Sequence, residues 1–312
     1  MEKIEDSLKG VKRNVSLKNY TTFKIGGSAR YFFTAETKDD LMAAVLAAEK
    51  LNLPFFILGA GSNLLVSDSG FDGLIIKIQT TKYKILNTKI IAGAGAKLGE
   101  LLIVSLKNGL AGLEWAAGIP GTLGGAIFGN AGSFGQSIGG LIEKVEVFNT
   151  KTMKIESFKN KKFKFGYRRS IFKKNKNLII LSAEIQLKKD DKRNIKSRLE
   201  KFLELREESQ PLNFPSAGSI FKNSRLGGRQ AKGFFAGQLI EKCGLKGKRI
   251  GKAEISKKHA NFIINLGGAK AGDVKKLITL AKRSIKNKFS VNLEEEIEFL
   301  GTKPRRLSKN KL

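Results

Sequence analysis

The sequence of 312 residues is poor in the side chains that build metal centres and cross-links. It contains one cysteine, Cys243, and one histidine, His259. A single thiol excludes an intrachain disulfide framework and a multi-thiolate metal site. A single imidazole excludes a multi-histidine metal centre. We therefore expect neither a disulfide nor a metal site.

Long apolar runs are also missing. The first ten residues, MEKIEDSLKG, are charged and lack the apolar centre of a signal peptide. The longest weakly charged stretch, residues 111–140, contains Pro120 and many glycines, so it could not satisfy its backbone as a membrane helix. Hydrophobic residues make up 41% and charged residues 28%, which is typical of a globular protein. These features predict a soluble cytoplasmic protein without membrane contact.

Acidic residues are scarce relative to basic ones. The 28 Asp and Glu residues stand against 58 Lys and Arg residues, which gives a formal net charge of +30. The basic residues cluster at 159–176 and 303–311, which fits either a nucleic-acid footprint or a solubilising, lysine-rich surface. No zinc-finger spacing, RNP-type aromatic motif or helix-turn-helix pattern accompanies them. We favour the second interpretation and expect no specific nucleic-acid partner, because positive charge alone does not recognise a nucleotide sequence.

The periodicity of apolar residues indicates an α+β fold. The predicted helices are 39–52, with Asp39 or Asp40 as its N-cap, 98–108, 191–208, 237–243 and 273–286. The predicted strands are 55–58, 64–66, 74–78, 83–86, 89–92, 145–148, 153–158, 178–187, 219–221, 261–266 and 293–300. The long polar helix 191–208 is expected to connect the second section to a third. The predicted domains are residues 1–75, 76–200 and 201–312.

A glycine loop follows the first predicted strand. The five residues are Gly59, Ala60, Gly61, Ser62 and Asn63. The loop resembles the start of the GxGxxG dinucleotide motif, but Leu64 stands where the third glycine should be and no helix follows, so a Rossmann site is not expected. Its exposed amide groups suit a diphosphate, although an ordinary hairpin turn would fit equally well.

A second glycine-rich segment changes that balance. Nine glycines fall between Gly118 and Gly140, more than a surface loop requires. Glycine at this density allows the backbone to approach a large flat ligand and to adopt positive φ. Two such loops on one α+β module indicate a cofactor with a diphosphate and an extended body, such as a flavin dinucleotide.

Several motifs together resemble one known family. They are TTFKIGG (21–27), GAGSNLLVSD (59–68), GIPGTLGGAIFGNAGSFG (118–135), FGYRRS (165–170), SAGSIFKN (216–223), GLKG (244–247), HANFIIN (259–265) and LEEEIEFLG (293–301). Their order and content resemble the UDP-N-acetylenolpyruvoylglucosamine reductase family, also called the MurB family. The resemblance runs from about residue 21 to residue 301.

The resemblance implies a fold and a reaction. The fold would be a two-lobed FAD-binding module of the vanillyl-alcohol-oxidase type, followed by a C-terminal α+β substrate-binding domain. NADPH would reduce a noncovalent FAD, and the enolpyruvyl group of UDP-GlcNAc-enolpyruvate would then be reduced to UDP-N-acetylmuramate for peptidoglycan synthesis. An oxidase or dehydrogenase on the same flavin fold is the alternative within flavoenzymes. A basic nucleic-acid-binding protein is the alternative from another class, and it would leave the glycine loops unexplained.

The resemblance also assigns catalytic roles. Ser219 would donate the proton, and Arg168 and Glu296 would polarise and stabilise the substrate carboxylate. A serine after glycine is ordinarily a turn residue, and Arg168 lies in a basic run beside Arg169. Strand alternation would place Glu294 and Glu296 on the same face, so spacing alone does not choose between them. The family motif selects Glu296.

Further positions follow from the matching motifs. The expected substrate-binding residues are Asn223, Lys246, His259 and Tyr167, and Lys222 is a further candidate. The expected cofactor-binding residues are Gly59, Ala60, Gly61, Ser62, Asn63, Gly118, Ile119, Pro120, Gly121, Thr122, Gly124, Gly125 and Asn130. For His259, a satisfied histidine at the start of a strand remains an equally good interpretation. We expect a monomer.

The chain departs from the family pattern in two places. Ser224 stands where the family often has proline, which leaves the local loop shape open. No insertion between Lys188 and Pro211 is long enough for a substrate-capping loop that bears a tyrosine. The chain therefore resembles the shorter, type II branch of the family. The tail after residue 302 lies beyond the match and is expected to be disordered.

Overall fold

The N-terminal part of the chain forms a four-stranded sheet. The computed structural model describes residues 4–159, 162–223 and 235–301. The strand order is β1-β2-β5-β3, with β1 antiparallel to β2 and the other neighbours parallel. The strands are β1 (Lys12–Ser16), β2 (Ser28–Ala35), β3 (Phe55–Leu58) and β5 (Phe71–Ile78). The helices of this part are α1 (Ile4–Ser7), η1 (Leu17–Tyr20, a 3-10 helix) and α2 (Lys38–Lys50).

Helix α2 begins at Lys38, one residue before the start predicted from the sequence. Its N-cap is Thr37, whose hydroxyl accepts from the amide of Asp40 at 3.0 Å. The Asp40 carboxylate in turn accepts from the Thr37 amide at 2.9 Å. This reciprocal capping box satisfies two backbone donors, so the predicted cap at Asp39 or Asp40 is wrong.

A five-stranded antiparallel sheet follows, in the order β12-β11-β13-β7-β6. The strands are β6 (Tyr83–Leu86), β7 (Lys89–Gly93), β11 (Ile142–Asn149), β12 (Lys154–Lys159) and β13 (Leu178–Gln186). The helices of this part are α3 (Leu98–Lys107), α4 (Leu123–Gly129), α5 (Ile171–Lys174) and two 3-10 turns, η2 (Glu114–Ala116) and η3 (Ile138–Gly140). Two short pairs complete it: β8 (Leu110–Ala111) with β14 (Lys188–Lys189), and β9 (Gly132–Ser133) with β10 (Gln136–Ser137).

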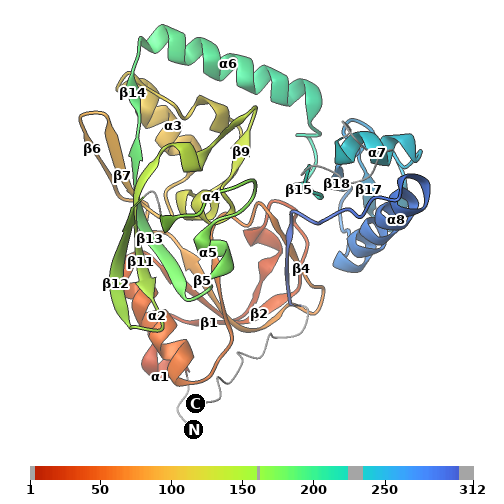
Figure 1. Ribbon diagram of the computed structural model, residues 1–312. Coiled ribbons are helices and arrows are strands. Elements are labelled where there is room, and N and C mark those ends of the chain that lie inside the picture. Colours follow the sequence, from red (N-terminus) through yellow and green to blue (C-terminus); the bar gives the residue numbers. More distant parts are fainter. Residues whose placement is uncertain (1–3, 160–161, 224–234, 302–312) are drawn as a thin grey trace.

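The long helix α6 (Lys192–Ser209) leads to a C-terminal unit, as Figure 1 shows along the top of the molecule. The described residues of this unit form a four-stranded sheet, β15-β18-β17-β16, and two helices. Its elements are β15 (Ser216–Ser219), α7 (Ala236–Lys242), β16 (Arg249–Ile250), β17 (Ala253–Ile255), β18 (Phe262–Asn265) and α8 (Ala271–Phe289). The chain then returns to the first sheet region, where β19 (Glu298–Leu300) pairs in parallel with β4 (Leu64–Val66).

In the part of the chain that the structure describes, buried apolar side chains form three hydrophobic clusters. The largest extends from Ile4 to Leu187 and therefore includes apolar side chains from both sheets of the first two sections. A second cluster belongs to the C-terminal unit but also includes Phe23, Ile25 and Leu65. The predicted boundaries at residues 75 and 200 fall inside β5 and α6, and the division into domains stays a prediction. In the described chain, we find no helix that is both long and apolar enough to cross a bilayer.

One predicted strand is largely absent. Residues 293–300 were expected to be extended throughout, but regular pairing is limited to β19. Glu295 makes only an isolated bridge to Phe221. Around this bridge the Lys222 amide donates to the Glu294 carbonyl and the Glu296 amide donates to the Ile220 carbonyl, so one bridge rather than a ladder sets the local register. The basic tail after residue 302 and the segment from Ser224 to residue 234 lie outside the described residues.

Candidate active site

A large cavity lies where the sheets and the C-terminal unit meet. Its volume is about 1940 Å³. Ordinary small-molecule pockets measure about 300–1,000 Å³, so this cavity has room for a dinucleotide and a second ligand. Its walls come from the first glycine loop, the second glycine loop, the end of α6 and the segments around Ser219 and Glu296.

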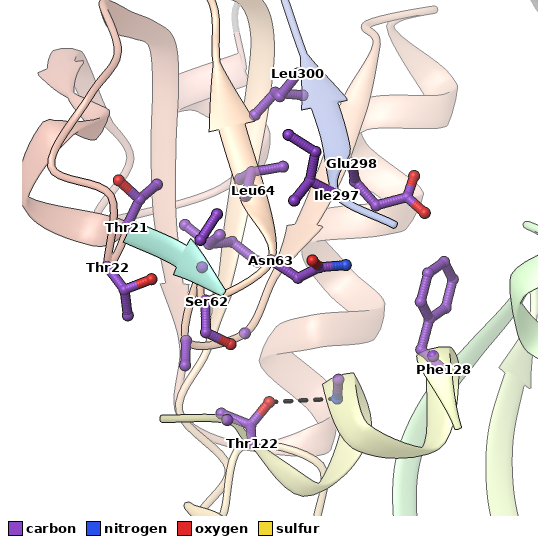
Figure 2. A pocket seen from close by; sticks show the side chains of 18 of the residues that line it. Thr21, Thr22, Ser62, Asn63, Leu64, Thr122, Phe128, Ile297, Glu298 and Leu300 are labelled. Atoms are coloured by element: carbon purple, nitrogen blue, oxygen red, sulfur yellow. Dashed lines mark hydrogen bonds between the residues drawn. The ribbon is translucent and has the colours of Figure 1, made fainter. Parts of the chain in front are cut away.

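The first glycine loop is held in a conformation that larger residues could not adopt. Gly61 has φ +65°, and a Cβ atom there would lie 2.2 Å from the Tyr20 carbonyl oxygen. A Cβ atom on Gly59 would lie 2.6 Å from the hydroxyl oxygen of Thr122. Figure 2 shows Ser62 and Asn63 of this loop above Thr122 of the second loop. The glycines therefore allow the two loops to close on each other.

The second glycine segment contains helix α4, which the sequence interpretation did not anticipate. Thr122 caps this helix, and its hydroxyl accepts from the Gly125 amide at 3.3 Å (Figure 2). A Cβ atom on Gly124 would lie 2.8 Å from the Ala94 side chain, so the helix packs directly on the backbone before α3. Low helix propensity concealed it, because glycine is disfavoured in helices unless close packing requires it.

All the predicted cofactor-binding residues except Asn130 line the cavity. Asn130 has φ +45° and is buried. Its side-chain amide donates to the Gly166 carbonyl at 2.8 Å, and its side-chain oxygen accepts from the Gly139 amide at 3.0 Å. Asn130 thus joins two loops behind the cavity wall.

Arg168 and Glu296 form an ion pair on the cavity wall. Nε of Arg168 donates to a carboxylate oxygen of Glu296, and its Nη2 donates to the Gly132 carbonyl at 3.1 Å. Arg168 sits at φ +53° in a tight turn closed by hydrogen bonds between Gly166 and Arg169. This turn directs Arg168 toward the cavity and leaves Arg169 exposed.

Backbone hydrogen bonds bring Ser219 next to this pair. The Glu296 amide donates to the Ile220 carbonyl at 2.8 Å, one residue after Ser219. The Asn63 side chain donates to the Glu296 carbonyl at 3.0 Å, which ties the first glycine loop to the same point. Ser219 lines the cavity, and no described residue makes a hydrogen bond to its hydroxyl.

The three neighbouring glutamates have three different partners. Glu294 is exposed and pairs with Lys222, whereas Glu295 pairs with Lys282 at 2.8 Å. Only Glu296 reaches Arg168, and of the three it alone lines the cavity. The structure therefore brings together Ser219, Arg168 and Glu296, as the family motif implied.

The predicted substrate-binding residues form a second group outside the cavity wall. The backbone amide of Asn223 donates to the Tyr167 hydroxyl at 2.9 Å, and the side-chain oxygen of Asn223 accepts from the backbone amide of Ala236 at 3.0 Å. Lys246 pairs with Glu241 at 2.6 Å. This group therefore borders the candidate catalytic residues through Tyr167, the neighbour of Arg168.

His259 lies in the same region. Burial lowers the pKa of its imidazole, and the nearby charge of Lys246 lowers it further. Its Nδ1 accepts from the Asn261 amide at 3.1 Å, and its ring meets the edge of Phe262, a cavity residue. The lowered pKa thus favours the neutral imidazole, and its Nδ1 atom has a hydrogen-bond partner at the margin of the cavity.

The sequence interpretation missed Arg206, a buried cation in the cavity wall. Arg206 is 7% exposed, and burial lowers the pKa of its guanidinium. Its Nη atoms donate to Gln210 and Ser133 at 3.3 Å, whereas its Nε atom has no partner among the described residues. The sequence did contain a signal for its burial. Arg206 follows Leu199 by seven residues and Phe202 by four, which places it on the apolar stripe of α6.

These features fit a flavin dinucleotide. The glycines allow the two loops to pack closely at the cavity wall, and the cavity accommodates a long ligand. Two buried polar atoms of cavity residues, Oγ1 of Thr21 and Nε of Arg206, lack protein partners in the described chain. Such orphaned atoms are costly unless a ligand or water satisfies them.

Comparison with known proteins agrees with this geometry. Residues 29–150 match the model of an FAD binding domain, and residues 210–300 match the model described as UDP-N-acetylenolpyruvoylglucosamine reductase, C-terminal domain. A reductase of that name from Caldanaerobacter subterraneus subsp. tengcongensis is 42% identical, with 97% of this chain and 98% of the relative covered. The chain belongs to the UDP-N-acetylenolpyruvoylglucosamine reductase family.

Other members of the UDP-N-acetylenolpyruvoylglucosamine reductase family are also similar to this chain in sequence and in structure. The reductase from Thermotoga sp. (strain RQ2) is 42% identical over 96% of this chain and 97% of its own length. The crystal structure of the reductase from Thermus caldophilus superposes with a TM-score of 0.78 at 35% identity, over 93% of this chain and 98% of that chain. The predicted FAD-dependent oxidoreductase and the predicted two-part architecture, an FAD-binding module followed by a C-terminal α+β domain, are confirmed.

Proposed function

We propose that this chain catalyses the NADPH-dependent reduction of UDP-GlcNAc-enolpyruvate to UDP-N-acetylmuramate through a noncovalent FAD, in peptidoglycan precursor synthesis. The observation that carries the proposal is the convergence of Ser219, Arg168 and Glu296 beside the two glycine loops. Both proposed substrates are nucleotides of the cytoplasm, where we place the reaction.

The cofactor would rest on the two glycine loops and carry hydride from NADPH to the enolpyruvyl double bond when bound. The loops supply backbone amides and close approach rather than charge. Neither the single cysteine nor the single histidine lines the cavity, which supports noncovalent attachment.

Arg168 is suited to hold the substrate carboxylate. Hydride addition at the terminal carbon places negative charge on the carboxylate as an enolate-like species, and a preorganised cation lowers the energy of that species. Glu296 and the Gly132 carbonyl fix the guanidinium before substrate arrives. Glu296 thereby orients Arg168. The remaining N–H groups of the guanidinium would donate to both oxygens of the substrate carboxylate.

Ser219 is suited to deliver the proton to the adjacent carbon. Its hydroxyl lines the cavity and, in the described chain, makes no competing hydrogen bond, so it is available for a reacting group. Positioned proton transfer contributes about 10²–10⁴-fold to a rate. A serine is a weak acid, so the proposal requires rapid return of its proton from solvent or a neighbour.

The nucleotide end of the substrate would extend toward the second group of residues. Asn223, Lys246 and His259 lie beyond the catalytic residues, and Tyr167 connects the two groups through its hydroxyl. Lys246 supplies a positive charge for a diphosphate, at the cost of its present pairing with Glu241.

The test separates the two half-reactions in one anaerobic cuvette. NADPH should bleach the visible flavin band, and UDP-GlcNAc-enolpyruvate should restore it. In Ser219→Ala, bleaching should remain within twofold of the wild type, whereas restoration should slow by about 100-fold or more because the proton donor is lost. Normal restoration in that variant would remove Ser219 from the mechanism.

The matched control is Ser216→Ala. Ser216 lies on the same strand and also lines the cavity, but its hydroxyl accepts from the Gly218 amide at 3.4 Å. Both half-reactions should stay near wild-type rates. If NADPH bleaches the flavin band of the wild type but UDP-GlcNAc-enolpyruvate does not restore it, the protein is still an NADPH-reducible flavoenzyme, but the proposed enolpyruvyl substrate is wrong.

A further inference from the structure

The cofactor cradle lacks a charge that its ligand requires. A diphosphate carries negative charge at neutral pH, yet the residues of both glycine loops that line the cavity are all uncharged. Backbone amides supply partial charges only, and phosphate sites commonly add a lysine or arginine. Among the described residues, the cations that line the cavity are Lys24, Lys77, Arg168, Lys173, Lys176 and Arg206.

Lys77 is the cation of this set that contacts the first glycine loop. It lies on β5 between Thr34 of β2 and Leu58 of β3 in the parallel ladder. Its Nζ atom donates to the Gly59 carbonyl at 2.5 Å. Side chains alternate along a strand, so Lys77 points to the face opposite to its buried neighbours Ile76 and Ile78, and it lines the cavity at the start of the loop.

The charge of Lys77 is not neutralised within the protein. No Asp or Glu of the described chain pairs with it, in contrast to Arg168 and Lys173, which pair with Glu296 and Glu298. Burial lowers the pKa of Lys77, and the charge of Lys97 lowers it further. A desolvated cation without a counter-ion is costly, and the cost falls when an anion binds beside it.

The loop next to Lys77 offers amide donors to the same anion. In the described part of the chain, the backbone amides of Ala60, Gly61 and Ser62 donate to no protein acceptor. The Gly59 carbonyl, which would repel an anion, is already occupied by Lys77. Three amides without a protein acceptor and one ammonium group therefore lie together at this loop of the cavity wall.

We propose that Lys77 is a cofactor-binding residue that supplies the counter-charge for the diphosphate of FAD. The inference depends only on FAD binding and holds whatever the second substrate of the enzyme is. It adds a residue on a central strand to a site otherwise formed by loops.

The test compares ligands with and without a diphosphate on deflavinated full-length protein, by quenching of flavin fluorescence. Lys77→Met should raise the Kd for FAD by about 10- to 100-fold, because a charge-assisted hydrogen bond contributes about 1.5–3 kcal/mol. Riboflavin carries the same ring without phosphate, so its Kd should change by less than about threefold. Lys77→Arg, which keeps the charge, should retain most of the affinity for FAD.

The control is Lys24→Met, which removes the same charge from an exposed lysine of the cavity wall. It should change the Kd for FAD by less than about threefold. An unchanged Kd in Lys77→Met, or an equal loss in Lys24→Met, would overturn the proposal. Equal weakening of FAD and riboflavin would show that Lys77 only supports the loop. Lys77→Gln provides the same comparison if Lys77→Met does not fold.

Discussion

The two walls of the cavity are built in different ways. The cofactor wall consists of backbone: glycines that approach Tyr20 and Thr122 more closely than any Cβ atom would allow. The proposed catalytic wall consists of charged side chains from distant segments, since Arg168 and Glu296 are 128 residues apart. A backbone wall is sensitive to added atoms, whereas a side-chain wall is sensitive to removed charge. Substitutions of these two kinds should therefore have separable effects.

The largest effect is expected on the catalytic wall. Glu296→Gln removes the charge that fixes Arg168, and turnover should fall by on the order of 100-fold, as for the loss of a preorganised electrostatic contact. Glu294→Gln, two residues away, removes an exposed partner of Lys222 and should change turnover by less than about twofold. Steady-state kinetics on both variants checks the ranking, and the reverse order would show that the motif is misregistered.

The next effect is expected on the cofactor wall. Gly61→Ala places a Cβ atom 2.2 Å from the Tyr20 carbonyl at φ +65°, and should lower the free energy of unfolding by about 1–3 kcal/mol. It should also weaken FAD binding. Gly99→Ala is the control, because Gly99 lies in α3 with nothing within 4 Å, and should stabilise by up to about 1 kcal/mol. Urea unfolding and FAD titration measure both; equal effects would contradict the comparison.

A smaller effect is expected in the group beyond the catalytic wall. Lys246→Ala should raise the KM for UDP-GlcNAc-enolpyruvate by about 10-fold with kcat changed less than about twofold, as for binding shared by ground and transition states. Lys242→Ala, four residues earlier on the exposed end of α7, should leave both constants unchanged. A large loss of kcat at unchanged KM would place Lys246 in the chemistry instead.

The smallest effect concerns His259 and pH. Because burial lowers its pKa in the folded state, the unfolded chain takes up the proton first as pH falls below the ordinary value of about 6.5. The free energy of unfolding should therefore decrease from about pH 6.5 toward the lower folded pKa, and should not depend on His259 above pH 7.5. Urea unfolding of the wild type and His259→Gln at pH 5.5 and 7.5 measures this difference. An identical pH dependence in both proteins would contradict it.

Much of the fold follows from local sequence. The bounds of α2, α3, α6 and α8 agree with apolar periodicity to within about three residues, because each helix buries one stripe. Helix α4 could not be predicted this way, since its glycines lower the helix propensity and its stability depends on contact with Ala94. The strand expected at 293–300 shortened to β19 because the partner strand β4 has only three residues.

The sequence by itself determined the cofactor class and indicated candidate catalytic residues, because glycine loops and short motifs are local patterns. Tertiary structure decided which glutamate meets Arg168, that Asn130 turns away from the cavity, and that Lys77 and Arg206 carry unpaired charge toward it. The physical reason is distance along the chain. The spacing of residues within a segment determines its backbone conformation and the side on which each side chain lies. The ion-pair partner of a charged side chain depends instead on how separate segments pack.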